Sequence, residues 1–156
     1  MRVKRVHHIA LRAKDLAASV KFYGEKFRFP EVLRYDFDDG SPCCVYVQVA
    51  DGQFIELFGE GQGDRAPRGE ATGFNHVCLV VDDLEEALAE LSEAGLQPSK
   101  DITTPDGHKL YYFEDPDGHP IELMPSAASK AQAEAAAAVA SGGRPTRVRM
   151  DVPRPA

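Results

Sequence analysis

Two histidines and two glutamates stand at matching positions of an internal repeat, and residues of these types can bind a metal ion together. The segment HIALRAKDLAASVKFY begins at His8 and aligns with HVCLVVDDLEEALAEL, which begins at His76, 68 residues later. The segment DGQFIELF contains Glu56 and aligns with DGHPIELM, which contains Glu122, at an offset of 66 residues. Five of these eight positions are identical. Two blocks that recur in one order at nearly one offset predict two copies of one module.

The four residues make a donor set that suits a divalent transition metal. Alternation along the strand places Glu56 between Phe54 and Phe58 on one face. A carboxylate among apolar neighbours is unfavourable to bury unless it is paired or coordinates a cation. Two imidazoles and two carboxylates suit Ni²⁺, Co²⁺ or Zn²⁺ and also Mn²⁺ or Fe²⁺. The prediction is one divalent ion per site, with room for water or substrate oxygens.

Each of the four residues also has an ordinary structural interpretation, since a lone strand histidine is usually a core residue and a lone strand glutamate usually faces water. Four matched positions argue against that interpretation. His7 is the rival ligand, but strand alternation turns it away from His8, and its counterpart in the second module is Asn75. The repeat therefore selects His8.

The elements that must position these residues follow from hydrophobic periodicity. Residues 6–12 alternate as a strand, and a helix follows in each module. Asp15 and Asp83 stand at the expected helix N-caps. Behind the caps, apolar residues recur at helical spacing, at Leu16, Val20, Tyr23 and Phe27 and again at Leu84, Leu88 and Leu91. Asp-Gly turns between alternating runs then predict hairpins, so each module reads βαβββ.

The expected fold is α+β, with two βαβββ modules that form a curved half-barrel sheet and helices outside. The paired domain is predicted over residues 1–126, with module one at about 3–60 and module two at about 72–126. Residues 127–156 are predicted to be an alanine-rich helix followed by a flexible tail.

Composition narrows the expected partners. The 156 residues carry a net charge of −7, which disfavours nucleic acid. No apolar run has the length of a membrane helix, so no membrane partner is expected. Three cysteines without a disulfide or zinc-site spacing indicate a reduced, cytoplasmic protein. The expected partner is a small-molecule substrate.

The motifs resemble those of the vicinal oxygen chelate superfamily. The resemblance covers residues 3–126 and rests on the H-hydrophobic-x-Leu-x-x-x-Asp-Leu start, the DPDG-x-x-IEL block and the two-module layout. Within that superfamily the quartet looks most like that of glyoxalase I, the lactoylglutathione lyase. The resemblance implies one metal ion held by His8, Glu56, His76 and Glu122. It further implies a homodimer in which modules from two chains can complete each site.

The implied reaction is a lyase or isomerase proton transfer through a metal-chelated enediolate, on an α-hydroxycarbonyl or hemithioacetal substrate. Glu122 is the first choice for the catalytic base, and Glu56 is its symmetric partner. Arg12 matches the family arginine four residues after the first ligand, and Glu60 stands where the family usually has Asn. Tyr46 and Gln48 share one strand face, and Tyr112 is the repeat partner of Tyr46, so all three are further candidates for substrate binding, with aromatic packing as the alternative role of the tyrosines.

Two other classes remain as alternatives. A ring-cleaving Fe(II) extradiol dioxygenase uses two histidines and one carboxylate, and needs no ligand at the position of Glu56. A metal-free resistance protein that binds a small molecule lacks the quartet. Methylmalonyl-CoA epimerases usually carry Gln at the second ligand position, and fosfomycin-modifying enzymes rely on three ligands. The complete quartet therefore favours the glyoxalase type.

Overall fold

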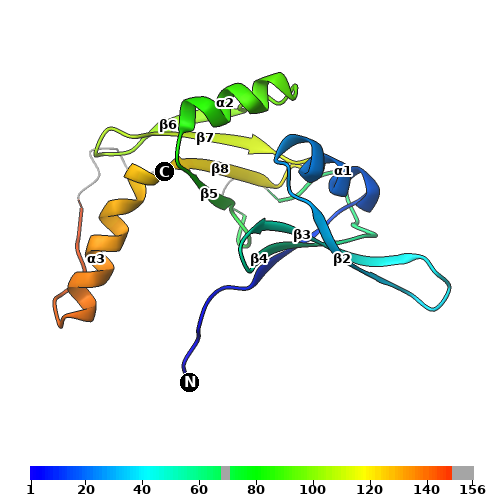
Figure 1. Ribbon diagram of the computed structural model, residues 1–156, viewed down its shortest axis with the longest axis horizontal. Helices are drawn as coiled ribbons and strands as arrows, with labels where there is room; N and C mark the ends of the chain where they lie inside the picture. Colours follow the sequence, from blue (N-terminus) through cyan, green and yellow to red (C-terminus); the bar gives the residue numbers. More distant parts are fainter. Residues whose placement is uncertain (68–70, 149–156) are drawn as a thin grey trace.

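The computed structural model describes residues 1–67 and 71–148, and within them the chain folds as two βαβββ modules (Figure 1). The first module comprises β1 (His8–Arg12), α1 (Leu16–Lys26), β2 (Glu31–Asp36), β3 (Pro42–Ala50) and β4 (Gln53–Phe58). The second comprises β5 (Val77–Val81), α2 (Leu84–Glu93), β6 (Lys100–Thr103), β7 (Lys109–Glu114) and β8 (Pro120–Pro125). The predicted α+β class is confirmed.

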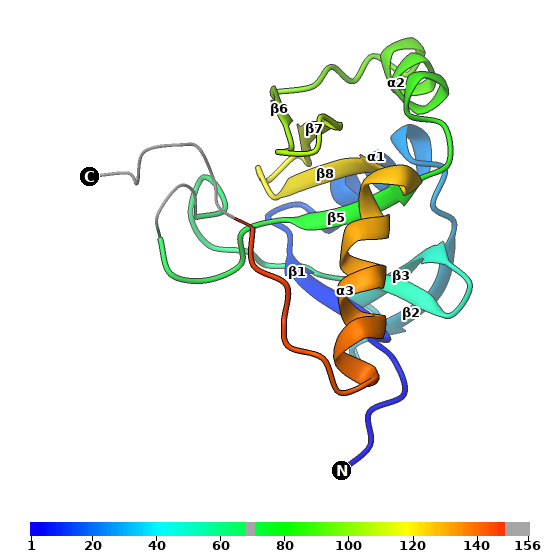
Figure 2. The ribbon, with the colours of Figure 1, turned by 90° about the vertical axis from the view of Figure 1, so that its left-hand side faces the viewer.

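Each module builds one four-stranded sheet, and the two sheets have the same topology. The strand orders are β1-β4-β3-β2 and β5-β8-β7-β6, with the first strand parallel to the last and the other pairs antiparallel. Figure 2 shows the two sheets one above the other. They are separate hydrogen-bonded ladders in the described chain, so the half-barrel is not one continuous sheet here. β1 and β5 are consequently edge strands.

The two helices begin at their predicted caps. The side chain of Asp15 accepts a hydrogen bond from the backbone N–H of Ala18, and that of Asp83 accepts one from Glu86, each at 3.0 Å. Each cap satisfies a backbone donor that the first helical turn leaves unpaired. The caps thereby fix where each helix begins relative to the strand that precedes it.

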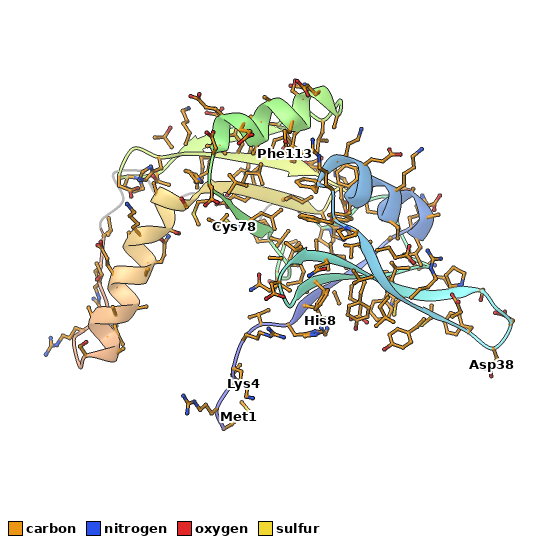
Figure 3. The ribbon with its side chains drawn as sticks, in the orientation of Figure 1. Met1, Lys4, His8, Asp38, Cys78 and Phe113 are labelled. Atoms are coloured by element: carbon orange, nitrogen blue, oxygen red, sulfur yellow. The ribbon has the colours of Figure 1, made fainter. Side chains whose placement is uncertain are left out.

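Strand alternation gives each sheet one apolar face and one site face. Val47, Ile55 and Leu57 are fully buried on the face that α1 covers. In the second module Phe113 lies between the sheet and α2, whereas Cys78 lies on the opposite side of the sheet (Figure 3). We call the faces opposite the helices the site faces, because Glu56 and Glu122 lie there. The helix-side core holds each sheet rigid behind its glutamate.

The chain continues beyond the second module as a separate element. A 3₁₀ turn, η1 (Ser126–Ser129), packs on β5 and β8 and buries Ala128. The helix α3 (Lys130–Ala140) then extends away from the sheets and has no buried residue (Figures 1 and 2). The predicted flexible tail lies in part at 149–156, outside the described residues. In the described ranges, no helix has both the length and the apolar composition that crossing a bilayer requires.

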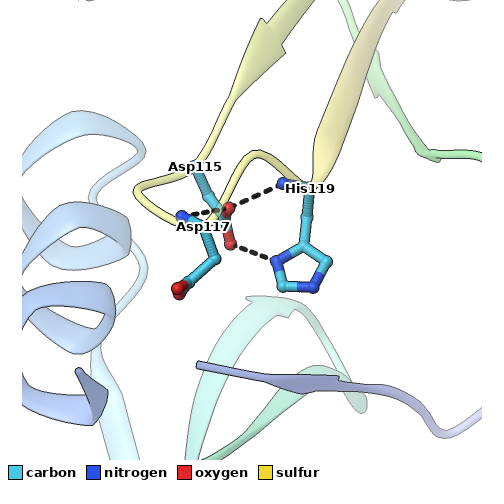
Figure 4. A group of neighbouring side chains, drawn as sticks. All are labelled: Asp115, Asp117 and His119. Carbon is cyan, nitrogen blue, oxygen red and sulfur yellow. Dashed lines mark hydrogen bonds and ion pairs between the residues drawn. The ribbon is translucent and has the colours of Figure 1, made fainter. Parts of the chain in front are cut away.

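A hydrogen-bond network joins the modules at the turn between β7 and β8, and Figure 4 shows the residues Asp115, Asp117 and His119 of this turn. Asp115 Oδ2 accepts from the Tyr23 hydroxyl of α1 at 3.1 Å and lies 2.9 Å from His119 Nδ1. Asp115 Oδ1 accepts from the backbone N–H groups of Asp117 and His119, at 3.0 and 2.8 Å. The carboxylate of Asp117 accepts from Ser19 Oγ and from the backbone N–H of Lys14. Because Tyr23 and Asp115 come from different modules, this network fixes how the modules sit within one chain.

The network around Asp115 predicts that the stability of the protein depends on pH. The hydrogen bond from His119 to Asp115 raises the pKa of His119 above its ordinary value of 6.5. A folded-state pKa above the unfolded value contributes stability that is complete below pH 6.5 and is lost as the pH rises through the folded pKa. The free energy of unfolding is measured by urea denaturation at pH 6 and at pH 8.5. It should fall by about 1 kcal/mol more between these pH values in the wild type than in the His119→Gln variant. Parallel pH profiles for the two proteins would contradict this role of His119.

Candidate metal centre

The first half of the site lies at the middle of the first sheet. His8 opens β1, and Glu56 lies on the adjacent strand β4, with Ala10 as its register partner. His8 Nε2 and Glu56 Oε2 are 3.2 Å apart. The other carboxylate oxygen, Oε1, accepts from the Tyr46 hydroxyl at 2.7 Å and from Cys44 Sγ at 3.6 Å. The histidine thus faces one oxygen of Glu56, and both β3 donors occupy the other.

The second half repeats this set on the second sheet. His76 lies just before β5, and its Nε2 is 3.0 Å from Glu122 Oε2 on β8. Cys78 Sγ donates to Glu122 Oε1 at 3.5 Å. The Tyr112 hydroxyl on β7 donates at 2.5 Å, but to Oε2, the oxygen that also faces His76. The four residue types are the same in both halves, but two details differ: the tyrosine contacts a different oxygen, and the thiol comes from β5, the histidine strand, and not from the tyrosine strand as in the first half.

The residue before each histidine contacts the far side of its ring. His76 Nδ1 is 2.7 Å from the side-chain oxygen of Asn75, which can only accept a hydrogen bond. In the tautomer with the proton on Nδ1, Asn75 accepts a hydrogen bond from Nδ1, and Nε2 is the ring nitrogen that faces Glu122. In the first module His7 takes the place of Asn75, with its Nδ1 3.0 Å from His8 Nδ1. His7 thus lies against the ring of His8 on the side away from Glu56.

The donor spacing fits a cation. Two ligand atoms at about 2.1 Å from one ion and at a right angle to each other are about 3 Å apart. The histidine–glutamate separations of 3.2 and 3.0 Å match this value in both halves. Nε2 lone pairs and carboxylate oxygens are also ligand types that divalent transition metals accept.

The four residues do not gather into one cluster within the chain. In residues 1–67 and 71–148, the group of three or more His, Cys, Asp or Glu donors within 4.8 Å is Asp115, Asp117 and His119. The carboxylate oxygens of Asp115 and Asp117 already accept hydrogen bonds in the network that joins the two modules. We therefore assign that group to structure. The quartet stands as two pairs, and a cavity of about 180 Å³ has His8 and Cys78 in its wall.

Burial and the carboxylates keep the neighbouring hydroxyls and thiols protonated. The hydrogen bond to Glu56 raises the pKa of Tyr46 to about 12, and burial is the chief cause of the raised pKa of Tyr112. Burial likewise raises the pKa of Cys44 to about 11 and that of Cys78 to about 12. Each tyrosine and each cysteine is therefore a hydrogen-bond donor to its glutamate at neutral pH.

The remaining residues singled out from the sequence lie on the site face of the first sheet. Arg12 follows Ala10 on that face, donates to the backbone oxygen of Gly59 at 2.9 Å and lies over the ring of Phe58. Gln48 is the register partner of Phe54, and its amide donates weakly to Ala50 at 3.4 Å. Neither contacts a glutamate, so their substrate-binding roles stay predictions.

Sequence reasoning missed two features. Cys44 shares a face with Tyr46, so strand alternation could have placed its thiol at Glu56. The network around Asp115 left no such signal, because its partner Tyr23 lies 92 residues away in the chain.

Two βαβββ modules with a histidine–glutamate pair on each site face define the vicinal oxygen chelate class. The family model of the Glyoxalase/Bleomycin resistance protein/Dioxygenase superfamily matches residues 5–123, and the chain belongs to this superfamily. The structure is similar to that of lactoylglutathione lyase from Agrobacterium tumefaciens, with a TM-score of 0.63, 25% identity and coverage of 81% of this chain and 97% of that one.

Two bacterial relatives match over nearly their whole length. The uncharacterized protein YaeR of Escherichia coli K12 is 35% identical over 127 residues, which cover 78% of this chain and 95% of YaeR. The uncharacterized protein YwkD of Bacillus subtilis 168 is 31% identical over 125 residues, which cover 79% of this chain and 98% of YwkD. The matches establish the family and leave the reaction open.

The raised thiol pKa values predict slow alkylation. At pH 8 a thiol with a pKa of about 12 is a thiolate roughly a thousandfold less often than an ordinary cysteine. We expect iodoacetamide to modify Cys78 at least about a hundredfold more slowly than free cysteine, as followed by peptide mass spectrometry. Glu122→Gln removes the neighbouring charge and should speed the reaction several-fold, whereas Glu85→Gln on the exposed side of α2 should not. Rapid alkylation in wild type would show that Cys78 does not donate to Glu122.

Proposed function

We propose that the protein is a metal-dependent lyase or isomerase of the glyoxalase type. The observation that carries the proposal is the repeated set of histidine, glutamate, tyrosine and cysteine, with histidine–glutamate separations of 3.2 and 3.0 Å. A buried carboxylate needs a partner, and two carboxylates that each face an imidazole nitrogen can share a cation as that partner.

The proposed metal ligands are His8, Glu56, His76 and Glu122, with one divalent ion per site. Nickel, cobalt and zinc are the first choices for a site of two imidazoles and two carboxylates, and manganese and iron are the second choices. When bound, the cation acts as a Lewis acid that stabilises negative charge developing on two neighbouring substrate oxygens.

The chain's own residues then move the proton. In an α-hydroxycarbonyl or hemithioacetal substrate, Glu122 removes the proton from one carbon and returns it to the adjacent carbon. Glu56 is its symmetric counterpart and remains with His8. Arg12 and Gln48, on the site face beside Glu56, are proposed to contact the rest of the substrate, together with the rings of Tyr46 and Tyr112.

The second carboxylate separates this proposal from the alternatives. An iron dioxygenase needs only two histidines and one carboxylate. Here Glu56 has its own imidazole, Tyr46 hydroxyl and Cys44 thiol as neighbours, and these contacts support its proposed role as the fourth ligand. A metal-free binding protein would need neither pair.

The three free cysteines support a reducing, cytoplasmic location.

The decisive assay measures turnover as a function of the metal. The purified protein is stripped with a chelator and reloaded with Ni²⁺, Co²⁺ or Zn²⁺ in turn. Thioester formation from methylglyoxal and glutathione is then followed by absorbance. Turnover that depends on one of these ions supports the glyoxalase reaction. One bound metal per site without turnover would reject the glutathione hemithioacetal and direct the search to other α-hydroxycarbonyl compounds. A protein that binds none of these ions would reject the metalloenzyme.

The roles of ligand and base can be separated by substitution. Glu122→Gln keeps an oxygen donor but cannot accept the proton, so we expect most of the metal to remain and turnover to fall by about 10²–10⁴-fold. His8→Ala should instead lose metal, as measured by elemental analysis after dialysis. Glu25→Gln on the exposed face of α1 is the matched control. Turnover near wild type in Glu122→Gln would remove Glu122 as the base.

We propose a homodimer in which the first module of one chain faces the second module of its partner. Three observations support it: the quartet stands as two separate pairs, β1 and β5 are both edge strands, and the Tyr23–Asp115 joint ties the two modules of one chain together away from the pairs. Each edge strand has unpaired backbone groups that a second chain can satisfy. A twofold dimer of this kind contains two identical sites.

A mixing experiment tests shared sites. His8→Ala and His76→Ala homodimers should both be inactive, because each lacks one ligand in both sites. In a mixed dimer, the intact first module of one chain meets the intact second module of the other, so one site of two is complete. Random mixing makes half of the dimers mixed, and we expect about a quarter of wild-type activity and metal content. Sites completed within one chain would show no recovery.

A further inference from the structure

We propose that Tyr46 and Tyr112 are positioning residues with different tasks: Tyr46 fixes Glu56 as a permanent metal ligand, and Tyr112 retains Glu122 when that carboxylate leaves the metal for the substrate. The inference rests on the proposed function. It is carried by a difference between the repeat-equivalent tyrosines of the two half-sites, which is the carboxylate oxygen that each one contacts.

In the first half-site, the tyrosine and the histidine contact different oxygens. Tyr46 donates to Glu56 Oε1 at 2.7 Å, while Oε2 faces His8 Nε2 at 3.2 Å. A donor on the rear oxygen leaves the front oxygen available and fixes the rotation of the carboxylate. Such a partner favours a carboxylate that binds metal through one oxygen and stays there.

In the second half-site, both contacts fall on one oxygen. Glu122 Oε2 accepts from Tyr112 at 2.5 Å and faces His76 Nε2 at 3.0 Å. A cation held by His76 and this oxygen of Glu122 would share the oxygen with the tyrosine hydroxyl. The hydroxyl would then stabilise the charge of Glu122 whenever the carboxylate is not bound to the cation. Glu122 is 6% exposed, so without this donor the released carboxylate would keep only the weak Cys78 thiol at 3.5 Å.

Each tyrosine also contacts the histidine of its half-site. The rings of Tyr46 and His8 meet edge to face at 5.7 Å, and those of Tyr112 and His76 at 5.6 Å. Tyr112 is held further by Lys100, whose ammonium lies 4.3 Å from its ring centroid, and it is 8% exposed. A rigid ring therefore sets the position of the hydroxyl, and a Phe substitution removes the donor while the ring contacts remain.

The test compares Tyr46→Phe and Tyr112→Phe in the full-length protein. Two further substitutions are matched controls: Tyr35→Phe, whose ring lies on the same site face beside Tyr46, and Tyr111→Phe, whose side chain packs on the core side of β7. Metal affinity is measured by competition between each Co²⁺-loaded protein and a chromogenic chelator, and kcat and KM are measured with the substrate that wild type turns over. The affinity measurement needs no substrate.

Loss of an outer hydrogen bond to a ligand typically lowers metal affinity or activity by about 10–100-fold. We expect Tyr46→Phe to weaken Co²⁺ binding by about that factor. We expect Tyr112→Phe to change Co²⁺ affinity less than about threefold and to lower kcat about tenfold with little change in KM. Both control variants should match wild type.

Equal losses of affinity in the two variants, or no loss in either, would overturn the division of tasks. If wild type binds Co²⁺ but shows no turnover, the proposed reaction fails while the affinities still decide the inference: a loss confined to Tyr46→Phe supports it, and any other pattern rejects it. A wild-type protein that binds no Co²⁺ would reject the proposed function, and this inference with it.

Discussion

A carboxylate at the centre of an apolar sheet has to be neutralised or hydrogen-bonded, and this constraint organises both modules. Glu56 and Glu122 are 9% and 6% exposed, and an unpartnered charge at such positions would disfavour folding by several kcal/mol. Each sheet meets the requirement with one imidazole at the neighbouring first strand, a hydroxyl on the third strand and a thiol, which comes from the third strand in the first module and from the first strand in the second. The site is thus an outcome of satisfying buried charge, and its residues are required together.

Strand alternation keeps this polar set apart from the core. Ile55 and Leu57 flank Glu56 in sequence, yet they point to the helix side and are fully buried. The same holds for Ile121 and Leu123 around Glu122. A register shift of one residue would exchange the faces, bury two polar sets and expose the core. The core therefore fixes the register, and the register fixes which side chains face the metal position.

The sequence allowed the prediction of those features of the fold and the site that depend on a local pattern of residues. The repeat, the helix caps and the face on which each strand residue lies follow from spacing and alternation, because these set direction and neighbours over a few residues. The distribution of hydrogen bonds over carboxylate oxygens does not, since it depends on side-chain rotamers. The hydrogen bond between Tyr23 and Asp115 could not be predicted either, because the two residues belong to different modules and no periodicity relates them.

The repeat makes the two half-sites alike in composition, so any division of labour between Glu56 and Glu122 has to arise from geometry. The structure supplies one such difference: Tyr46 contacts the oxygen of Glu56 that His8 does not face, whereas Tyr112 contacts the same oxygen of Glu122 that His76 faces. Lys100 lies over the ring of Tyr112 and adds to that difference on the second sheet. A duplicated module can therefore surround two equivalent carboxylates with different hydrogen-bond partners, without any change in the paired histidines and glutamates. It follows that the donors around each glutamate, and not the repeated histidine–glutamate pair, are what distinguishes the two half-sites.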